Sequence, residues 1–178
     1  MTSGRTYLER FRLTGRHAVV TGGGRGIGLA CAEALAEAGA EICITDSDPE
    51  IAKAGVAALK AKGSSARSEV FDVTDPTKVN EVAGRLNRDW GLVDVLVCNA
   101  GIARSDTPAE TVSDEHWRNV IEVNLNGVFW CCRAFGGQML KASRGAIVNV
   151  GSMSGFIVNR PQPQSLSTPE LKCIVWPE

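Results

Sequence analysis

The chain has 178 residues, a formal net charge of −1 and 44% hydrophobic residues. This length is typical of one domain, which buries roughly 70% of the surface of its unfolded chain. The balanced charge gives no sign of a nucleic-acid partner, and the longest apolar runs fall well short of the ~20 residues that span a bilayer. The first fourteen residues are polar and basic, so we expect an N-terminal arm over 1–14 and no secretion signal.

Beyond this arm, short apolar runs alternate with helical patterns. Five runs rich in valine or isoleucine predict buried parallel strands, at His17 to Thr21, Glu41 to Thr45, Ala66 to Phe71, Val93 to Cys98 and Ala146 to Val150. Helical spacing predicts helices at Gly26 to Ala38, Pro49 to Lys62, Pro76 to Trp90 and Asp114 to Lys141. This alternation predicts an α/β fold in which helices cover both faces of an open parallel sheet. Ligands bind such sheets at the carboxyl ends of the strands.

A glycine-rich run from Thr21 to Gly28 follows the first strand and opens the first helix. Small residues let the backbone approach an anion, and the unpaired N–H groups and dipole of the helix N-terminus hold it. The strand, turn and helix context is the one that the dinucleotide fingerprint requires. The candidate contacts with a dinucleotide in this run are Gly22, Arg25, Gly26, Ile27 and Gly28.

Asp46 stands just past the second strand, 18 residues after Gly28. A carboxylate there can accept both hydroxyl groups of an adenosine ribose, and it repels a 2′-phosphate. Arg25 argues more weakly the other way, because a guanidinium pairs with that phosphate. We therefore predict NAD as the cofactor, with NADP as the alternative. The structural alternative for Asp46 is a helix cap before Pro49.

Two further polar segments follow the third and fourth strands. The Asp72 carboxylate can accept a hydrogen bond from the adenine amino group, or it can serve only as a turn residue. Small residues after the fourth strand keep a cofactor channel open, and Asn99 can tie neighbouring strands together. The predicted cofactor site is completed by Asp72, Val73, Asn99, Ala100 and Gly101.

The chain contains six cysteines, and none forms a Cys-x-x-Cys pair. Most lie in apolar runs, as reduced core cysteines do. We therefore predict a reducing, cytoplasmic setting and no metal site.

Together these residues resemble the short-chain dehydrogenase/reductase family. The family's Thr-Gly-x-x-x-Gly-x-Gly matches Thr21 to Gly28, its adenine-contacting Asp matches Asp72, and its Asn-Ala-Gly matches Asn99 to Gly101. The resemblance covers roughly residues 13 to 164. It implies a Rossmann-type doubly wound sheet, NAD or NADP as the cofactor, and hydride transfer between the nicotinamide and a secondary alcohol or ketone.

The resemblance also implies two catalytic residues. Asn124, in an Asn-x-x-Gly pattern, matches the family's Asn that helps to hold a proton-relay water, and Ser152 matches the Ser that polarises the carbonyl group. Ser154 is a second candidate for the serine, but Ser152 directly follows the end of the fifth strand. The stretch from Gly151 to Gln162 looks like the branch that acts on polyols and sugar alcohols, so the resemblance implies a small alcohol or carbonyl substrate.

The family's Tyr-x-x-x-Lys pair has no counterpart after Ser152 in this sequence. The single tyrosine is Tyr7, and Lys172 has no tyrosine one helical turn before it. In the family, the ammonium group and the oxidised nicotinamide lower the pKa of the tyrosine phenol, which then shuttles a proton. The resemblance therefore implies an oxidoreductase, and without the Tyr-x-x-x-Lys pair we expect this chain to be inactive.

The sequence also ends before the family's next helix and last two strands. Because that helix covers a sheet face and pairs with the long helix in homo-oligomers, we expect the family's assembly to be lost. We expect apolar surface to be exposed instead, including Val128, Phe129 and Trp130.

From Asn159 to Glu178 the sequence has no helix or strand period, and four of the seven prolines lie there. We expect a poorly ordered tail whose residues after about Gln164 are not family sequence, through a frameshift, a retained intron or an alternative transcript. The expected organisation is an arm at 1–14, an incomplete dinucleotide-binding domain at 15–158 and an irregular tail at 159–178. Two other interpretations stay open, namely a non-catalytic nucleotide-binding module and an unstable fragment.

Overall fold

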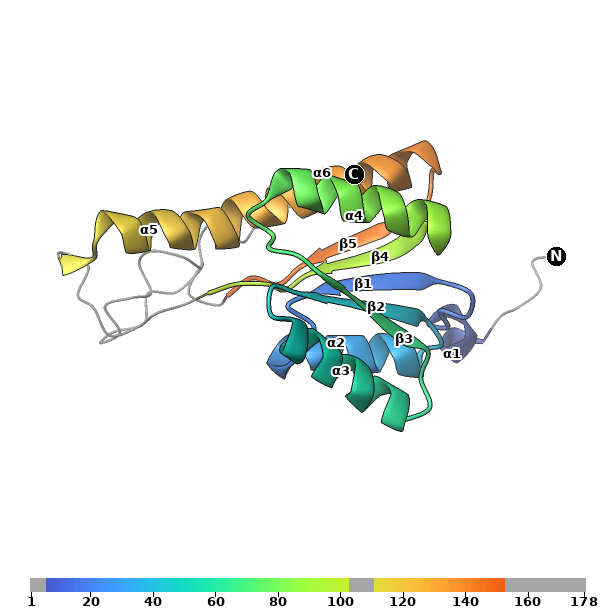
Figure 1. Cartoon of the computed structure of the whole chain (residues 1–178). Coiled ribbons are helices and arrows are strands. Elements are labelled where there is room, and N and C mark those ends of the chain that lie inside the picture. Colours follow the sequence, from blue (N-terminus) through green and yellow to red (C-terminus); the bar gives the residue numbers. More distant parts are fainter. Residues whose placement is uncertain (1–5, 103–110, 153–178) are drawn as a thin grey trace.

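The computed structural model describes residues 6–102 and 111–152, and five parallel strands form one open sheet in it (Figure 1). The strands are β1 (His17–Thr21), β2 (Glu41–Asp46), β3 (Ala66–Val70), β4 (Val93–Cys98) and β5 (Ala146–Asn149). Their order across the sheet is β3-β2-β1-β4-β5, and every neighbouring pair is parallel. The chain moves outward from β1 in both directions, so the doubly wound sheet is confirmed, and its switch point lies between β1 and β4.

Helices cover both faces of this sheet, as predicted. Figure 1 shows α2 (Gly26–Glu37) and α3 (Pro49–Ala61) on one face, and α4 (Pro76–Asp89) and α6 (Gly127–Lys141) on the other. The short helix α1 (Tyr7–Arg10) precedes β1, and α5 (Asp114–Ile121) leads into α6. In the part of the chain that the structure describes, no helix is long and apolar enough to cross a bilayer.

Two hydrophobic cores lie on opposite faces of the sheet, because successive residues of a strand point to opposite sides. On the α4 and α6 face, Val19 packs in one buried cluster with Leu86 and Phe135. On the α2 and α3 face, the next residue of β1, Val20, packs in a second cluster that includes Leu59. The two cores hold the strand ends, and therefore the loops that follow them, in fixed positions.

The prediction of a buried, apolar third strand is wrong. β3 is an edge strand whose side chains are exposed or half-buried. The Arg67 guanidinium lies over the Trp90 ring, 4.8 Å from its centre, and Glu69 forms an ion pair with Arg85. An edge strand that is covered mainly on one face carries polar residues on the other, so its sequence lacks the continuous apolar pattern of a central strand.

The long helix predicted from Asp114 to Lys141 is interrupted at its middle. A π-helical segment, η2 (Glu122–Asn126), separates α5 from α6. Single π-turns of this kind often occur at functional sites, and this one contains Asn124, a predicted site residue.

The expectation that α6 exposes its apolar residues is only partly met. Val128 is buried, because it faces the sheet and belongs to the core beneath α6. Its neighbour Phe129 points away from that core and is 38% exposed. On the edge strand β5, Val148 is 52% exposed. In the region of α6, the exposed apolar surface therefore lies on the outer side of the helix and on β5.

Candidate functional site

A cleft of about 530 Å³ opens at the carboxyl edge of the sheet, over the switch point. Loops after β1, β2, β3 and β4 all contribute to its walls. Ten of the residues predicted to bind a cofactor line this cleft, namely Gly22, Arg25, Gly26, Ile27, Asp46, Asp72, Val73, Asn99, Ala100 and Gly101. The remaining one, Gly28, lies buried below the glycine loop.

The glycine loop has no room for side chains at four of its positions, namely Gly22, Gly23, Gly24 and Gly28. A Cβ atom on Gly28 would lie 2.3 Å from the carbonyl oxygen of Gly22, and one on Gly24 would lie 2.4 Å from that of Ile51. A Cβ atom on Gly22, where φ is +59°, would lie 2.9 Å from the Cα atom of Ala100. Glycine at these positions therefore lets the loop lie flat between α2, α3 and the β4 loop.

Hydrogen bonds join this glycine loop to the loop after β4. The Asn99 side-chain amide donates to the carbonyl oxygens of Thr21 (3.1 Å) and Gly22 (3.0 Å). In return, the Thr21 hydroxyl oxygen accepts from the backbone N–H groups of Asn99 and Ala100, both at 3.0 Å. Asn99 thus ties the neighbouring strands β1 and β4 together, as predicted, and the cleft has a fixed floor.

The N-terminus of α2 meets the cleft without a side-chain cap. Asp48, Asp75 and Ser113 cap α3, α4 and α5 through backbone N–H groups in the first turn of each helix. At α2 the capping position is Arg25, and no side chain of the described residues accepts from the first turn. A helix start carries partial positive charge and unpaired N–H donors, so this end of the cleft is suited to an anion.

The acidic residues of the cleft are arranged at the ends of β2 and β3. Asp46 is half-buried, and its Oδ1 accepts from the N–H of Asp48 at 3.2 Å. The cap of α3 is Asp48 rather than Asp46, so the helix-cap interpretation of Asp46 is wrong. Asp72 is exposed, and its Oδ1 accepts from the N–H and hydroxyl groups of Thr74, both at 2.9 Å. Asp72 therefore holds a turn as well as lining the cleft.

Neither of the two predicted catalytic residues, Asn124 and Ser152, is among the lining residues of the cleft. Asn124 is 3% exposed, and its amide is engaged at both ends by one residue. Its Oδ1 accepts from the N–H of Ile102 at 2.8 Å, and its Nδ2 donates to the Ile102 carbonyl at 2.7 Å. Ser152 is half-buried and follows β5. Ser154 and Lys172 lie outside the described residues.

The single tyrosine lies at the opposite end of the sheet from this cleft (Figure 1). Tyr7 belongs to α1, and it is 79% exposed. In Figure 1, α1 lies beside the opposite edge of the sheet, where the strands begin.

Sequence reasoning missed several lining residues of the cleft. Thr45 and Phe71 directly precede two predicted residues, so their position next to strand ends could have indicated them. Asn119 and Val123 come from α5 and η2, and no local pattern places these helices beside the strand ends. Thr21 belongs to the glycine motif, but its role in joining the two loops emerges only in the folded protein.

Buried thiols lie below the cleft, in the core that α6 covers. The five described cysteines are reduced, and none of them forms a disulfide with another described residue. Hydrogen bonding to Cys132, together with burial, raises the pKa of Cys98, and burial raises the pKa of Cys131 to about 12. These thiols are protonated at neutral pH and are poor nucleophiles. The described residues contain no cluster of three or more side chains that could hold a metal ion.

The fold and the cleft define a doubly wound α/β protein, in which a glycine loop and a helix start meet acidic residues at the carboxyl ends of the strands. The model of the short chain dehydrogenase family matches residues 16–164. The chain belongs to this family.

Individual relatives agree with that assignment. The chain is 49% identical over 160 residues to a galactitol 2-dehydrogenase of Rhizobium johnstonii, with 90% of this chain and 62% of the relative covered. It is 40% identical to a sorbose reductase of Candida albicans, with 89% and 57% covered. A crystal structure of a gluconate 5-dehydrogenase from Burkholderia cenocepacia, in complex with NADP and tartrate, superposes with a TM-score of 0.84 at 36% identity, covering 92% of this chain and 64% of that one. The chain therefore spans about three fifths of the length of these relatives.

Proposed function

We propose that the cleft at the switch point binds an adenine dinucleotide. One observation carries the proposal: the uncapped start of α2 stands behind a glycine loop in which Gly22, Gly24 and Gly28 leave no room for a Cβ atom. A pyrophosphate would accept from the N–H groups of this helix start. The residues present fit the group, because the cleft continues from this loop to Asp46 at the end of β2 and Asp72 after β3.

The cofactor we propose is NAD, with NADP as the alternative. The Asp46 carboxylate lines the cleft where an adenosine ribose would lie, and it favours free hydroxyl groups over a 2′-phosphate. Arg25, in the same cleft, favours the phosphate, and the gluconate 5-dehydrogenase relative was solved with NADP. Calorimetric titration with NADH and NADPH decides between them. We expect NADH to bind roughly 10-fold more tightly, which is about 1.4 kcal/mol.

The variant Asp46→Ser isolates the contribution of that carboxylate. It removes the charge that repels a 2′-phosphate, so we expect NADPH affinity to rise and NADH affinity to fall. Equal preference for NADPH in the original protein and in the variant would show that Asp46 does not set the choice.

The reaction class we propose is hydride transfer between the cofactor and a secondary alcohol or ketone of a small polyol or sugar. The support comes from the relatives, which include a galactitol 2-dehydrogenase and a sorbose reductase. A bound nicotinamide supplies the hydride chemistry, while the protein supplies binding and orientation. In this proposal Ser152 polarises the carbonyl group, and Asn124 holds the Ile102 segment of the cleft wall in place.

We further propose that the 178-residue chain itself turns over slowly or not at all. Proton transfer in this family is assigned by resemblance to a Tyr-x-x-x-Lys pair, and the only tyrosine here is Tyr7, exposed on α1. Loss of a positioned general acid or base typically lowers the rate by a factor of about 10²–10⁴. The same observation favours a second candidate function, a non-catalytic nucleotide-binding module.

Binding and turnover are measured on the same preparation. We expect calorimetry to give one NADH site per chain and an assay of galactitol oxidation to give at most about one hundredth of the rate of the Rhizobium johnstonii relative. A rate equal to that of the relative would refute the proposed loss of activity. A broad, low-temperature melt without NADH binding would instead favour an unstable fragment.

A further inference from the structure

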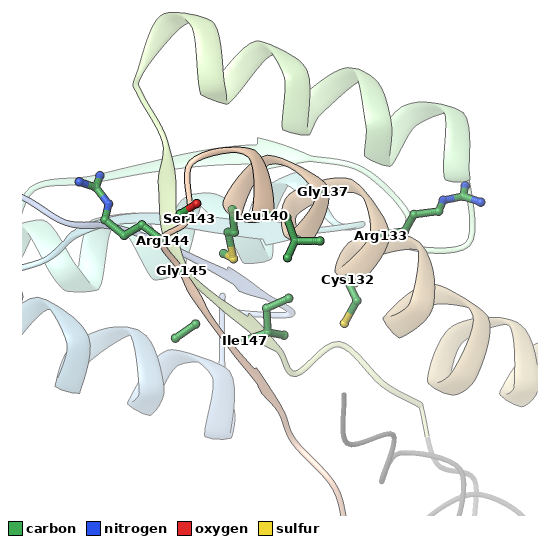
Figure 2. Close-up of a pocket in the computed structure, with 11 residues that line it drawn as sticks. Cys132, Arg133, Gly137, Leu140, Ser143, Arg144, Gly145 and Ile147 are labelled. Atoms are coloured by element: carbon green, nitrogen blue, oxygen red, sulfur yellow. The ribbon is translucent and has the colours of Figure 1, made fainter. Parts of the chain in front are cut away.

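A second cavity, of about 630 Å³, lies away from the cofactor cleft, between α6 and β5 (Figure 2). Its walls are largely apolar and include Met139, Leu140 and Ile147. Two glycines of α6 leave it open, because a Cβ atom on Gly137 would meet nothing within 4 Å and one on Gly136 would meet only the end of Ile147. We call this cavity the α6–β5 groove.

The groove is an incompletely covered part of the molecule. Leu140 is 81% exposed although it belongs to a helix that packs on the core. β5 is the last strand of the sheet, and no strand of the described residues pairs with its outer edge. An exposed leucine beside an open strand edge marks a surface that another chain segment can cover.

Positive charge stands at both ends of the groove. Figure 2 shows Arg133 and Arg144 on opposite sides of Leu140 and Ile147. Arg144 is 53% exposed at its side chain and donates from Nε to the Asp94 carboxylate at 2.7 Å. The Arg133 guanidinium lies over the aromatic ring of Trp130, 4.4 Å from its centre. The groove therefore suits an apolar segment of net negative charge.

We propose that the segment from Glu170 to Glu178 of this same chain docks in the α6–β5 groove. The sequence there contains the apolar run Cys173-Ile174-Val175-Trp176, with Glu170 and Lys172 before it and Glu178 after it. The apolar run complements the apolar walls of the groove, and the segment carries a net charge of −1 opposite the two arginines.

The length of the connecting chain permits this docking. The described chain ends at Ser152, and the 21 residues from there to Cys173 can span up to roughly 70 Å. The groove runs beside α6, whose 15 residues span about 22 Å. A segment that belongs to the same chain as its binding site reaches an effective concentration in the millimolar range. Docking within one chain is therefore favoured over docking between two copies in dilute solution.

Disulfide trapping with the native Cys173 tests this docking. The variant Leu140→Cys places a thiol at the groove, and Leu8→Cys is the matched control because Leu8, on α1, is also 81% exposed. Both proteins are oxidised mildly at micromolar concentration, and the cross-linked peptides are identified by mass spectrometry. Circular dichroism checks that each variant is folded. We expect the intramolecular disulfide to Cys173 to form at least roughly 10-fold faster from Leu140→Cys than from Leu8→Cys.

A third variant separates specific docking from random contact. Adding Trp176→Ser to Leu140→Cys removes the largest apolar side chain of the segment, and we expect it to slow the intramolecular cross-link. Equal rates for Leu140→Cys and Leu8→Cys would overturn the proposal. A cross-link that forms only between two copies would also overturn it and would assign the groove to a partner copy.

Discussion

The substitution Gly28→Ala tests whether the close packing of the glycine loop is needed for cofactor binding. The added Cβ atom would lie 2.3 Å from the carbonyl oxygen of Gly22 and 2.5 Å from Nδ2 of Asn99. These atoms have to move apart by about 1 Å to restore ordinary contact. The two atoms that would be displaced, Nδ2 of Asn99 and the carbonyl oxygen of Gly22, are joined by a hydrogen bond of 3.0 Å. The change therefore strains the loop and loosens its link to β4.

The magnitude follows from these two effects. Forcing an extra carbon into a packed site costs about 1–3 kcal/mol, and a lost hydrogen bond costs about 1 kcal/mol. We expect the free energy of unfolding to fall by about 2–4 kcal/mol. Misplacing two N–H donors to a pyrophosphate, at about 1.5 kcal/mol each, lowers NADH affinity roughly 100-fold.

Urea unfolding and calorimetric titration with NADH measure the two effects. Gly84→Ala on α4 is the matched control, because the nearest atom to its added carbon is Nη1 of Arg88, at 3.4 Å. The control should keep wild-type NADH affinity and gain up to about 1 kcal/mol in stability. Wild-type NADH affinity in Gly28→Ala would refute the proposal that the loop cradles the phosphates.

Three further predictions concern buried groups. The Asp94 carboxylate is 5% exposed and is bound by two arginines and a backbone N–H group. We expect Asp94→Ala to lower the free energy of unfolding by about 2 kcal/mol, measured by urea titration. Asn124→Ala leaves both backbone groups of Ile102 without their partner, so we expect a loss of about 2–3 kcal/mol and weaker NADH binding. Burial raises the pKa of Cys43 and Cys131 to about 12, from 9.0. Since the folded thiols ionise later, their contribution to stability is complete below pH 9 and is lost between pH 9 and 12, at about 1.4 kcal/mol per thiol per pH unit.

Each of these predictions has an outcome that contradicts it. An Asp94→Ala protein with a wild-type urea midpoint would mean that the arginines are satisfied equally well by water. Unchanged stability in Asn124→Ala would mean that the Ile102 segment is held by other contacts. A double variant, Cys43→Ala with Cys131→Ala, should show a flatter decline in stability above pH 9. An identical decline would assign the alkaline loss to other groups.

The fold could be predicted from the sequence where the local pattern of apolar residues alone decides the structure of a segment. β1, β2 and β4 are central strands, and their continuous apolar runs predicted them within one residue. The position of β3 was predicted correctly, but its burial was predicted wrongly. At the edge of the sheet, the polar side chains of β3 interact with Trp90 and Arg85, which come later in the chain and cannot be identified as partners from the local sequence. Val128 was expected at the surface, but helix periodicity alone does not say which side of α6 meets the sheet.

The candidate site was predictable to the extent that it lies at strand ends. Parallel strands bring their carboxyl ends to one edge, so the order of strands and loops along the chain is enough to group Gly22, Asp46, Asp72 and Asn99. The π-helical segment at Asn124 was not predictable, because its geometry accompanies hydrogen bonds to a residue 22 positions earlier. The capping contrast between α2 and the helices α3, α4 and α5 does follow a local pattern, because Asp or Ser precedes each of the three capped helices and Arg25 precedes α2.

A crystal structure of the chain grown with NADH tests the central claim most directly. The account predicts one dinucleotide per chain, with the pyrophosphate against the N–H groups that begin α2 and the adenosine ribose hydroxyls within hydrogen-bond distance of Asp46. Crystals that hold NADH elsewhere, or a cleft without cofactor density at saturating NADH, would contradict it.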